Sequence, residues 1–164
     1  MLRIEPVAIA DLPQISNLAR LVWWDHYPGI ISNEQIEYML SKEYAQDTLS
    51  QALQSGTVSY IKLINDDELI GFASYSQTDN GNEMQLHKLY IHPRFQRMGY
   101  GSALLGYVHE RAVQGGYKHL ILAVNKNNRK AISAYVKNGF VIKESICVDI
   151  GNGFYRDDYI MRKM

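Results

Sequence analysis

Apolar residues recur along this chain with two different spacings, and each spacing predicts one kind of element. Between residues 12 and 22 they recur every three or four positions, which is typical of a helix with one buried face. The segment 119–124 reads His-Leu-Ile-Leu-Ala-Val and is almost wholly apolar, as expected for a short strand buried on both sides. The two patterns together predict a domain that contains both helices and strands.

Capping and turn residues place the ends of these elements. Asp11 followed by Pro13 is expected to begin the first helix, and Ser32 with Gln35 fits a capping box for a second. Gly56 is expected to end a third helix. The predicted strands are 2–6, 58–64, 69–76, 83–91, 119–124, 141–149 and 154–162, and the predicted helices follow residues 11 and 32 and include 46–55, 102–114 and a segment around residue 135.

Composition narrows the class of protein. With 164 residues, 46% hydrophobic and 21% charged, the chain has the length and make-up of one globular domain, 1–164. Lys+Arg and Asp+Glu both number 17, and a formal charge of zero argues against a protein that coats nucleic acid. No stretch reaches the length of a membrane span and the first residues do not resemble a signal peptide, so we expect no membrane partner and a cytoplasmic location. The single cysteine, Cys147, has no partner for a disulfide, and no Cys/His cluster has metal-ligand spacing, so we expect no metal.

The segment 96–101, Gln-Arg-Met-Gly-Tyr-Gly, is the strongest sign of chemistry. It lies between the predicted strand 83–91 and the predicted helix 102–114. Glycines at such a junction let the backbone approach a ligand closely. The first N–H groups of the helix then face that ligand and favour an anion. The segment is therefore expected to hold phosphate, and specifically a pyrophosphate.

Two common phosphate-binding patterns do not fit this segment. The dinucleotide pattern G-x-G-x-x-G/A would begin at Gly99, but its sixth position is Leu104. The nucleotide P-loop would place Lys and Ser or Thr at positions 107 and 108, which are Tyr and Val. A plain strand–turn–helix junction and an unrelated nucleotide-dependent protein remain as alternatives.

The segment resembles Q/R-x-x-G-x-G/A, the acetyl-CoA signature of the GNAT N-acetyltransferase superfamily. A second resemblance, to the motif N-x-x-A-I/A-x-x-Y-x-x-x-G-F of that superfamily, follows about thirty residues later. In style both motifs are closest to the bacterial polyamine and protein-amine branch. The residues that carry the second motif are Asn128, Ala131, Ile132, Tyr135, Gly139 and Phe140.

The resemblance implies an α/β (α+β) fold with a mixed, twisted sheet of about seven strands and helices on both faces. Strands 83–91 and 119–124 would be parallel neighbours that splay apart, so that the pantetheine arm of acetyl-CoA binds between them like an added strand. The implied reaction is transfer of an acetyl group from acetyl-CoA to a primary amine by direct attack in a ternary complex. A module of the same fold that binds acetyl-CoA without turnover is the alternative.

The resemblance also assigns roles to residues. Tyr135 matches the general acid that protonates the leaving thiolate, a role that suits a phenol because it is neutral at pH 7. Asn128 would bind the pantetheine, and a helix N-cap is an equally good reading of that residue. Arg94 is a further candidate partner for the phosphates. The residues expected to bind the donor are Leu89, Tyr90, Ile91, Gln96, Arg97, Met98, Gly99, Tyr100, Gly101, Ser102 and Asn128.

The general base is less certain from the sequence. The position that carries the catalytic Glu in histone acetyltransferases is Gln85 here, which cannot take a proton. Glu83 and His87 lie two positions to either side and would share its strand face. We expect one of them, with Glu83 preferred, to act through a water.

The acceptor is expected to bind beside the first helix and the last hairpin. Trp24, Tyr27 and Gln85 are the candidate substrate-binding residues, because aromatic faces and polar groups can hold an amine. Asp157, Asp158 and Tyr159 on the last predicted strand are further candidates for the wall of this pocket. The acceptor itself, a small molecule or a protein amine, cannot be identified from the sequence. A homodimer is left open because members of the superfamily are often dimers.

Overall fold

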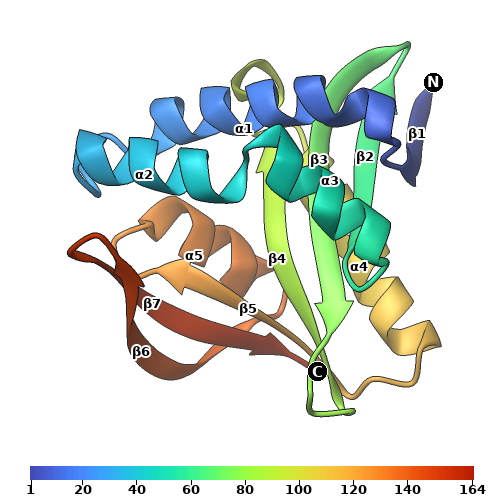
Figure 1. Cartoon of the computed structure of the whole chain (residues 1–164). Coiled ribbons are helices and arrows are strands. Elements are labelled where there is room, and N and C mark those ends of the chain that lie inside the picture. Colours follow the sequence, from blue (N-terminus) through green and yellow to red (C-terminus); the bar gives the residue numbers. More distant parts are fainter.

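A seven-stranded mixed sheet runs through the molecule, and helices cover both of its faces (Figure 1). The computed structural model covers residues 1–164. The strand order is β1-β2-β3-β4-β5-β7-β6, and only β4 and β5 pair in parallel. This arrangement confirms the predicted fold class. The strands are β1 (Leu2–Pro6), β2 (Ser59–Asn65), β3 (Glu68–Gln77), β4 (Glu83–Ile91), β5 (His119–Asn125), β6 (Val141–Gly151) and β7 (Phe154–Lys163).

The helices begin close to the predicted positions. Ser32 accepts a hydrogen bond from the backbone N–H of Gln35 at 3.1 Å, as the capping signal predicts. Asp11 does not cap the first helix with its side chain, because its carboxylate accepts from the N–H of Ala8 and from Lys62, both at 2.8 Å. The helices are α1 (Leu12–His26), α2 (Asn33–Glu43), α3 (Gln46–Ser55), α4 (Tyr100–Gln114) and α5 (Arg129–Lys137), with 3-10 turns at Ile9–Asp11 and Pro93–Phe95.

Two apolar cores lie on opposite faces of the sheet. On one face α1, α2 and α3 pack against β2 and β3 around the fully buried Phe72. On the other face α4 packs against β4 and β5 around Leu104 and Val108, and part of α5 joins this core. None of the helices combines the length and the hydropathy that a membrane span needs. No cluster of His, Cys, Asp and Glu side chains is arranged to hold a metal ion.

The two parallel strands separate halfway along their length. β4 and β5 pair from Glu83 opposite His119 to Leu86 opposite Leu122, and beyond this point β4 pairs only with β3. A bulge follows at once, since Leu86 and Lys88 pair with adjacent residues of β3 and leave His87 between them without a partner. The separation opens one edge of β4 over residues 87–91.

The bulge also changes which side chains of β4 face α1, α2 and α3. Tyr90 packs near Phe72 on that face, whereas Leu89 packs against the core beneath α4. Lys88 therefore lies on the same face as Tyr90, although simple alternation from Gln85 would place it on the other. This shift decides which polar groups reach the site described next.

Candidate active site

A cavity of about 1330 Å³ begins where β4 and β5 separate. Its walls come from residues 85–91 of β4, residues 123–125 of β5, the loop before α4, and α5. It continues beneath α1 and α2 to Asp158 on β7. One continuous space therefore connects the glycine loop with the ends of the early helices.

The loop before α4 presents a row of free backbone donors. The first hydrogen bond of α4 runs from the N–H of Ala103 to the carbonyl of Gly99, and none of the N–H groups of residues 97–102 donates to a protein acceptor. Gly99 and Arg97 adopt the left-handed conformation, with φ of +85° and +65°, which turns the chain into the helix. Consecutive free N–H groups at a helix start bind phosphate well. The backbone of this loop therefore has the geometry that the expected phosphate cradle needs.

Side chains of the loop leave this cradle open. Met98 points into solvent with 63% of its surface exposed, and Tyr100 packs against the ring of Phe95. A Cβ added to Gly101 would touch only Ile91, at 3.7 Å. The nearest wall of the cradle is thus backbone, which is what close approach of a pyrophosphate needs.

Other polar groups hold the loop in place. Gln96 donates from its amide to the carbonyl of Ile91 at 3.1 Å, which ties the loop to the end of β4. Arg94 lies 3.7 Å from Glu68 and is absent from the cavity wall, whereas Arg97 lines it. Of the two arginines, Arg97 is therefore the better placed for a phosphate. The free edge of β4, the open gap beside β5 and the cradle together fit the pantetheine arm and pyrophosphate of CoA.

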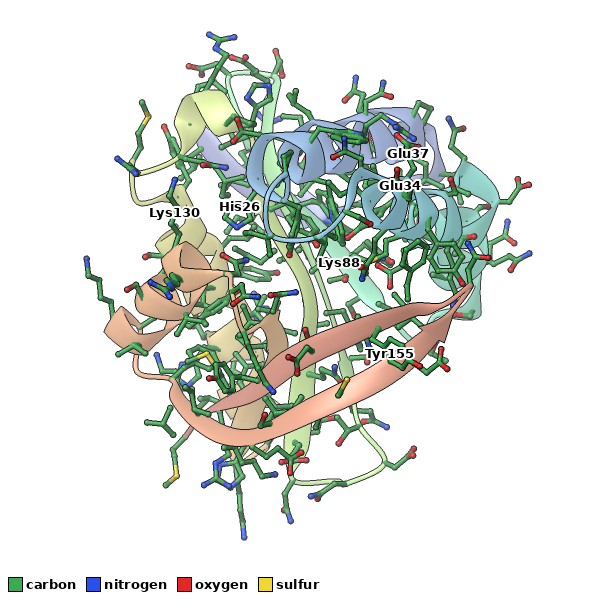
Figure 2. All side chains as sticks on the ribbon, turned by 90° about the vertical axis from the view of Figure 1, so that its left-hand side faces the viewer. His26, Glu34, Glu37, Lys88, Lys130 and Tyr155 are labelled. Carbon is green, nitrogen blue, oxygen red and sulfur yellow. The ribbon has the colours of Figure 1, made fainter.

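The start of α5 is fixed by one side chain. Asn128 is buried, and its amide oxygen accepts from the N–H of Ala131 at 3.2 Å and lies 2.7 Å from Nε2 of His26. Asn128 is thus the N-cap, as one of its two readings predicts, and it also lines the cavity. Its bond to His26, which is labelled in Figure 2, links α5 to the end of α1.

Tyr135 lies on the cavity side of α5. Its ring stacks edge-on against Phe140 with the centroids 5.6 Å apart, and its hydroxyl forms no hydrogen bond to protein. Burial raises the pKa of Tyr135 to about 12. The residue therefore offers a neutral O–H donor in the cavity at physiological pH.

The acceptor end of the cavity is aromatic. Tyr27 and Gln85 line it, as expected, and Tyr27 packs against Trp23 with ring centroids 4.4 Å apart. Trp24 does not line the cavity, because its indole N–H turns outward to Glu37 at 3.2 Å. The expected place of Trp24 in the cavity wall is therefore corrected, since Trp23 lines the cavity and Trp24 does not.

Glu83 is also not where a general base is needed. It lies at the paired end of β4, is absent from the cavity wall, and its carboxylate pairs with Lys143 at 3.3 Å. Because the strands separate only after Leu86, Glu83 is remote from the open edge. The preference for Glu83 is corrected by this placement.

His87 and Asp158, unlike Glu83, line the cavity. His87 lines the cavity and lies 2.6 Å from the hydroxyl of Ser76, and desolvation together with the Lys88 ammonium lowers the pKa of its ring. Asp158 is buried at the far wall, 3.9 Å from Nε of Arg156. Desolvation outweighs that neighbour and raises the pKa of Asp158.

Four further residues of this wall are absent from the sequence-based expectations. Lys88, Tyr44, Tyr60 and Ser74 all line the cavity from the face that carries α1, α2 and α3. The bulge at His87 brings Lys88 to this face, and no local sequence signal announces it. Tyr60 and Ser74 are brought together by the pairing of β2 with β3, which the local sequence around each residue does not reveal.

Comparison with known proteins agrees with this geometry. Residues 17–140 match the model of the acetyltransferase (GNAT) family. A spermidine N(1)-acetyltransferase of Thermoplasma acidophilum is 28% identical over 148 residues, which cover 88% of this chain and 91% of the relative. An uncharacterized N-acetyltransferase of Mycobacterium bovis is 25% identical over 82% of this chain and 85% of its own length.

Solved structures show the same architecture. The crystal structure of the PaiA N-acetyltransferase from Thermoplasma acidophilum in complex with coenzyme A superposes with a TM-score of 0.84 at 26% identity, and the alignment covers 99% of this chain and 98% of that one. The ribosomal-protein-S18-alanine N-acetyltransferase of Escherichia coli shares the fold, with a TM-score of 0.74 at 21% identity over 99% of this chain and 93% of its own. The chain thus belongs to the GNAT family and is an N-acetyltransferase that uses acetyl-CoA to acetylate an amine.

Proposed function

We propose that the acceptor is a primary amine carried by a small aliphatic molecule. The observation that supports this most directly is the single cavity, which runs from the phosphate cradle past Tyr135 to a chamber beneath α2. The hairpin of β6 and β7 closes over this chamber. Gln35 donates to the carbonyl of Tyr155 at 2.9 Å, and Tyr38 and Lys42 donate to the carbonyl of Ile150 at 2.8 and 3.1 Å.

The contacts between α2 and the β6–β7 hairpin cover the chamber and limit the size of an acceptor that can reach the acetyl group. Tyr38 also packs against Phe154, with ring centroids 5.3 Å apart, so side chains of α2 and the hairpin interlock. Figure 2 labels the next residue of the hairpin, Tyr155. A narrow aliphatic chain can enter a chamber covered in this way more easily than a residue on the surface of a folded protein can. The name of the Thermoplasma relative, a spermidine acetyltransferase, supports a small amine as well.

In this proposal Tyr135 is the general acid. When bound, acetyl-CoA supplies the activated acyl group, and Leu89 and its neighbours on the free edge of β4 orient the thioester through their backbone. A backbone N–H near Leu89 polarises the carbonyl as an oxyanion donor does. The hydroxyl of Tyr135 gives its proton to the departing sulfur.

Asp158 is the proposed general base. An aliphatic amine has a pKa close to that of lysine, so it arrives mainly as an ammonium ion and must lose a proton. Asp158 is buried and lines the same chamber, and its carboxylate lies 3.9 Å from Nε of Arg156 without accepting a hydrogen bond. Its raised pKa makes it a better proton acceptor than an exposed carboxylate, and its charge attracts the cation.

His87 is the second candidate for the base. It borders the open edge of β4 and its lowered pKa keeps the ring neutral at pH 7. Its ring nitrogen, however, is already engaged with Ser76. Asp158 accepts no hydrogen bond, since its ion-pair partner, Nε of Arg156, lies 3.9 Å away, and this is why we prefer it.

The cellular setting is a further proposal. The free, exposed Cys147 is consistent with the reducing cytoplasm.

The edge strand β6 is the proposed contact of a homodimer. Its apolar residues Val141, Ile142 and Val148 are exposed, which supports pairing of two chains through this edge. A sedimentation-velocity run on the wild-type chain and on Val141→Lys/Ile142→Lys tests that dimer, which should be lost in the double variant.

An acceptor screen tests the proposed function. The enzyme is incubated with acetyl-CoA and a panel of amines, namely aliphatic diamines and polyamines, amino acids, and peptides with a free N-terminus or a lysine, and the release of CoA thiol is followed. We expect turnover with at least one small amine at a kcat/KM well above that of any peptide. Binding of acetyl-CoA without turnover of any amine would contradict the proposal and favour a module that only binds the donor.

A further inference from the structure

Three polar side chains form a row across adjacent strands on the floor of the acceptor chamber. Tyr60 of β2 pairs in register with Ser74 of β3, and Ser74 pairs with Lys88 of β4. All three line the cavity, and Tyr60 and Ser74 are buried, with 6% and 0% of their surface exposed. The row lies beneath α2 and α3, on the face of the sheet away from α4.

The hydroxyl of Ser74 has no partner. It is fully buried and forms no hydrogen bond with the protein. A buried hydroxyl without a hydrogen bond costs the fold free energy, so such groups usually serve a ligand or hold a special role. Ser74 is among the residues that line the cavity, so we infer that a ligand in the chamber supplies the missing partner.

Lys88 brings a positive charge to the same row. Its ammonium donates to the hydroxyl of Tyr60 at 3.2 Å and lies over the rings of Tyr44 and Tyr60, 4.5 and 5.5 Å from their centroids. The rings fix the position of the cation without neutralising it. In Figure 2 Lys88 appears between α2 and the β6–β7 hairpin, within the chamber.

No carboxylate of the protein compensates this charge. Glu43 and Asp158 line the same cavity, yet Lys88 forms no salt bridge with either. The row therefore offers an ammonium and two hydroxyls, a set of groups that suits an anion with two oxygens. A second ammonium, as in a diamine or polyamine, would meet repulsion at this position.

We propose that Tyr60, Ser74 and Lys88 bind the carboxylate of the acceptor, so that the preferred substrate is an amino carboxylic acid with its primary amine at the opposite end. This inference rests on the proposed function, because it places the amine at Asp158 and Tyr135 while the carboxylate lies at Lys88. The relative named for spermidine acetylation would then differ from this chain in acceptor class.

Acceptors that are identical except for one end group isolate the contribution of the carboxylate to the reaction. Unbranched primary amines of three to six carbons are compared in three forms that differ only at the far end, which is a carboxylate, an alcohol or a second amine. We expect the best carboxylate to exceed the alcohol of the same length in kcat/KM by about tenfold or more, as for one charge-assisted hydrogen bond, and the diamine to be the poorest. A diamine that matches or exceeds the carboxylate would overturn the proposal.

Variants then test the row itself. Lys88→Met keeps the aliphatic stem and should abolish the preference for the carboxylate. Ser74→Ala should weaken that preference by a few fold without lowering the thermal stability, since it removes a hydroxyl that has no partner. Lys118→Met, which removes an exposed lysine outside the cavity, is the control and should leave the ratio of carboxylate to diamine unchanged. An unchanged ratio in Lys88→Met would contradict the assignment.

A binding measurement keeps this test independent of turnover. The enzyme is saturated with CoA, which carries no acetyl group, and each acceptor is titrated by calorimetry. Tighter binding of the carboxylate than of the diamine, lost in Lys88→Met, supports the subsite even if no amine is acetylated, in which case only the proposed function fails. 2-Aminoethyl phosphate is included, and tighter binding of this phosphate than of 3-aminopropanoate would overturn the choice of a carboxylate.

Discussion

Nε2 of His26 lies 2.7 Å from the amide oxygen of Asn128, although 102 positions separate the two residues in the chain. The contact joins the end of α1, which borders the acceptor chamber, to the first turn of α5, which carries Tyr135. The two sides of the reaction site are thus held together by one buried amide. This geometry gives Asn128 a structural duty beside any contact with the donor.

Replacement of Asn128 should therefore lower the stability of the folded protein. Asn128→Ala removes the N-cap and the bond to His26, and we expect a loss of about 1–2 kcal/mol in the free energy of unfolding. Asn128→Asp keeps an acceptor oxygen in place and should retain most of the stability. Urea denaturation of the two variants measures the difference, and a loss below about 0.5 kcal/mol in Asn128→Ala would argue against this role.

The phosphate cradle can be tested without disturbing the fold. Gly101→Val adds a side chain in a position where a Cβ meets only Ile91 at 3.7 Å, so the helix should form normally. The added methyl groups would reach toward the free N–H groups and should weaken acetyl-CoA binding by about tenfold or more, which is about 1.4 kcal/mol. Calorimetry gives the affinity.

Gly106→Val is the control for this variant. Gly106 lies in the same helix, faces open space and does not line the cavity. It should bear the same loss of helix propensity while keeping the affinity for the donor. Equal affinities in the two variants would remove the support for the cradle.

Asp158→Asn should slow the reaction and stabilise the protein. As the proposed base, Asp158 must be ionised, so kcat/KM of the wild type should fall as the pH drops through its raised pKa. The variant should lose at least about tenfold in kcat/KM near neutral pH. The fall of kcat/KM at low pH, which is the acid limb of the pH profile, should flatten in the variant. His87→Gln is the matched comparison and should keep the limb, whereas loss of the limb in His87→Gln alone would move the role to His87.

The raised pKa of Asp158 also makes the stability of the protein depend on pH. Because the pKa of Asp158 is higher in the folded than in the unfolded chain, the folded state binds the proton more tightly and stability falls as the pH rises from about 3.9 through the folded value. Asp158→Asn removes this penalty, so it should be more stable than the wild type at pH 7. The gain should shrink as the pH is lowered, which urea denaturation at several pH values will show.

Glu83→Gln tests the correction of the sequence-based assignment. Glu83 pairs with Lys143 outside the cavity, so the variant should keep kcat/KM within about twofold and retain the acid limb. A fall of tenfold in kcat/KM, with the limb lost, would restore Glu83 as the base and contradict the placement described above.

The sequence predicts the fold well because the fold depends on local patterns. Periodicity places the helices and strands within a few residues, and the glycines of the 96–101 segment predict the cradle. The helix stripe through Leu18 and Val22 also favours Trp23 over Trp24 as the inward-facing residue, a signal that the sequence reading did not use.

The details of the acceptor side depend on pairing between distant segments and could not be predicted. Glu83 fails as a base because β4 separates from β5 only after Leu86. Lys88 reaches the chamber because a bulge at His87 shifts the strand by one residue against β3. A single sequence contains no signal for either event.

The most direct test of the whole account is Tyr135→Phe, measured in both binding and turnover. If Tyr135 protonates the departing thiolate, the variant should bind acetyl-CoA with unchanged affinity by calorimetry and lose about 10²-fold or more in kcat on the best acceptor. The loss of the hydroxyl should not unfold the protein, because that hydroxyl makes no hydrogen bond to protein. A kcat within a factor of two of the wild type would contradict the account and reduce Tyr135 to a packing residue.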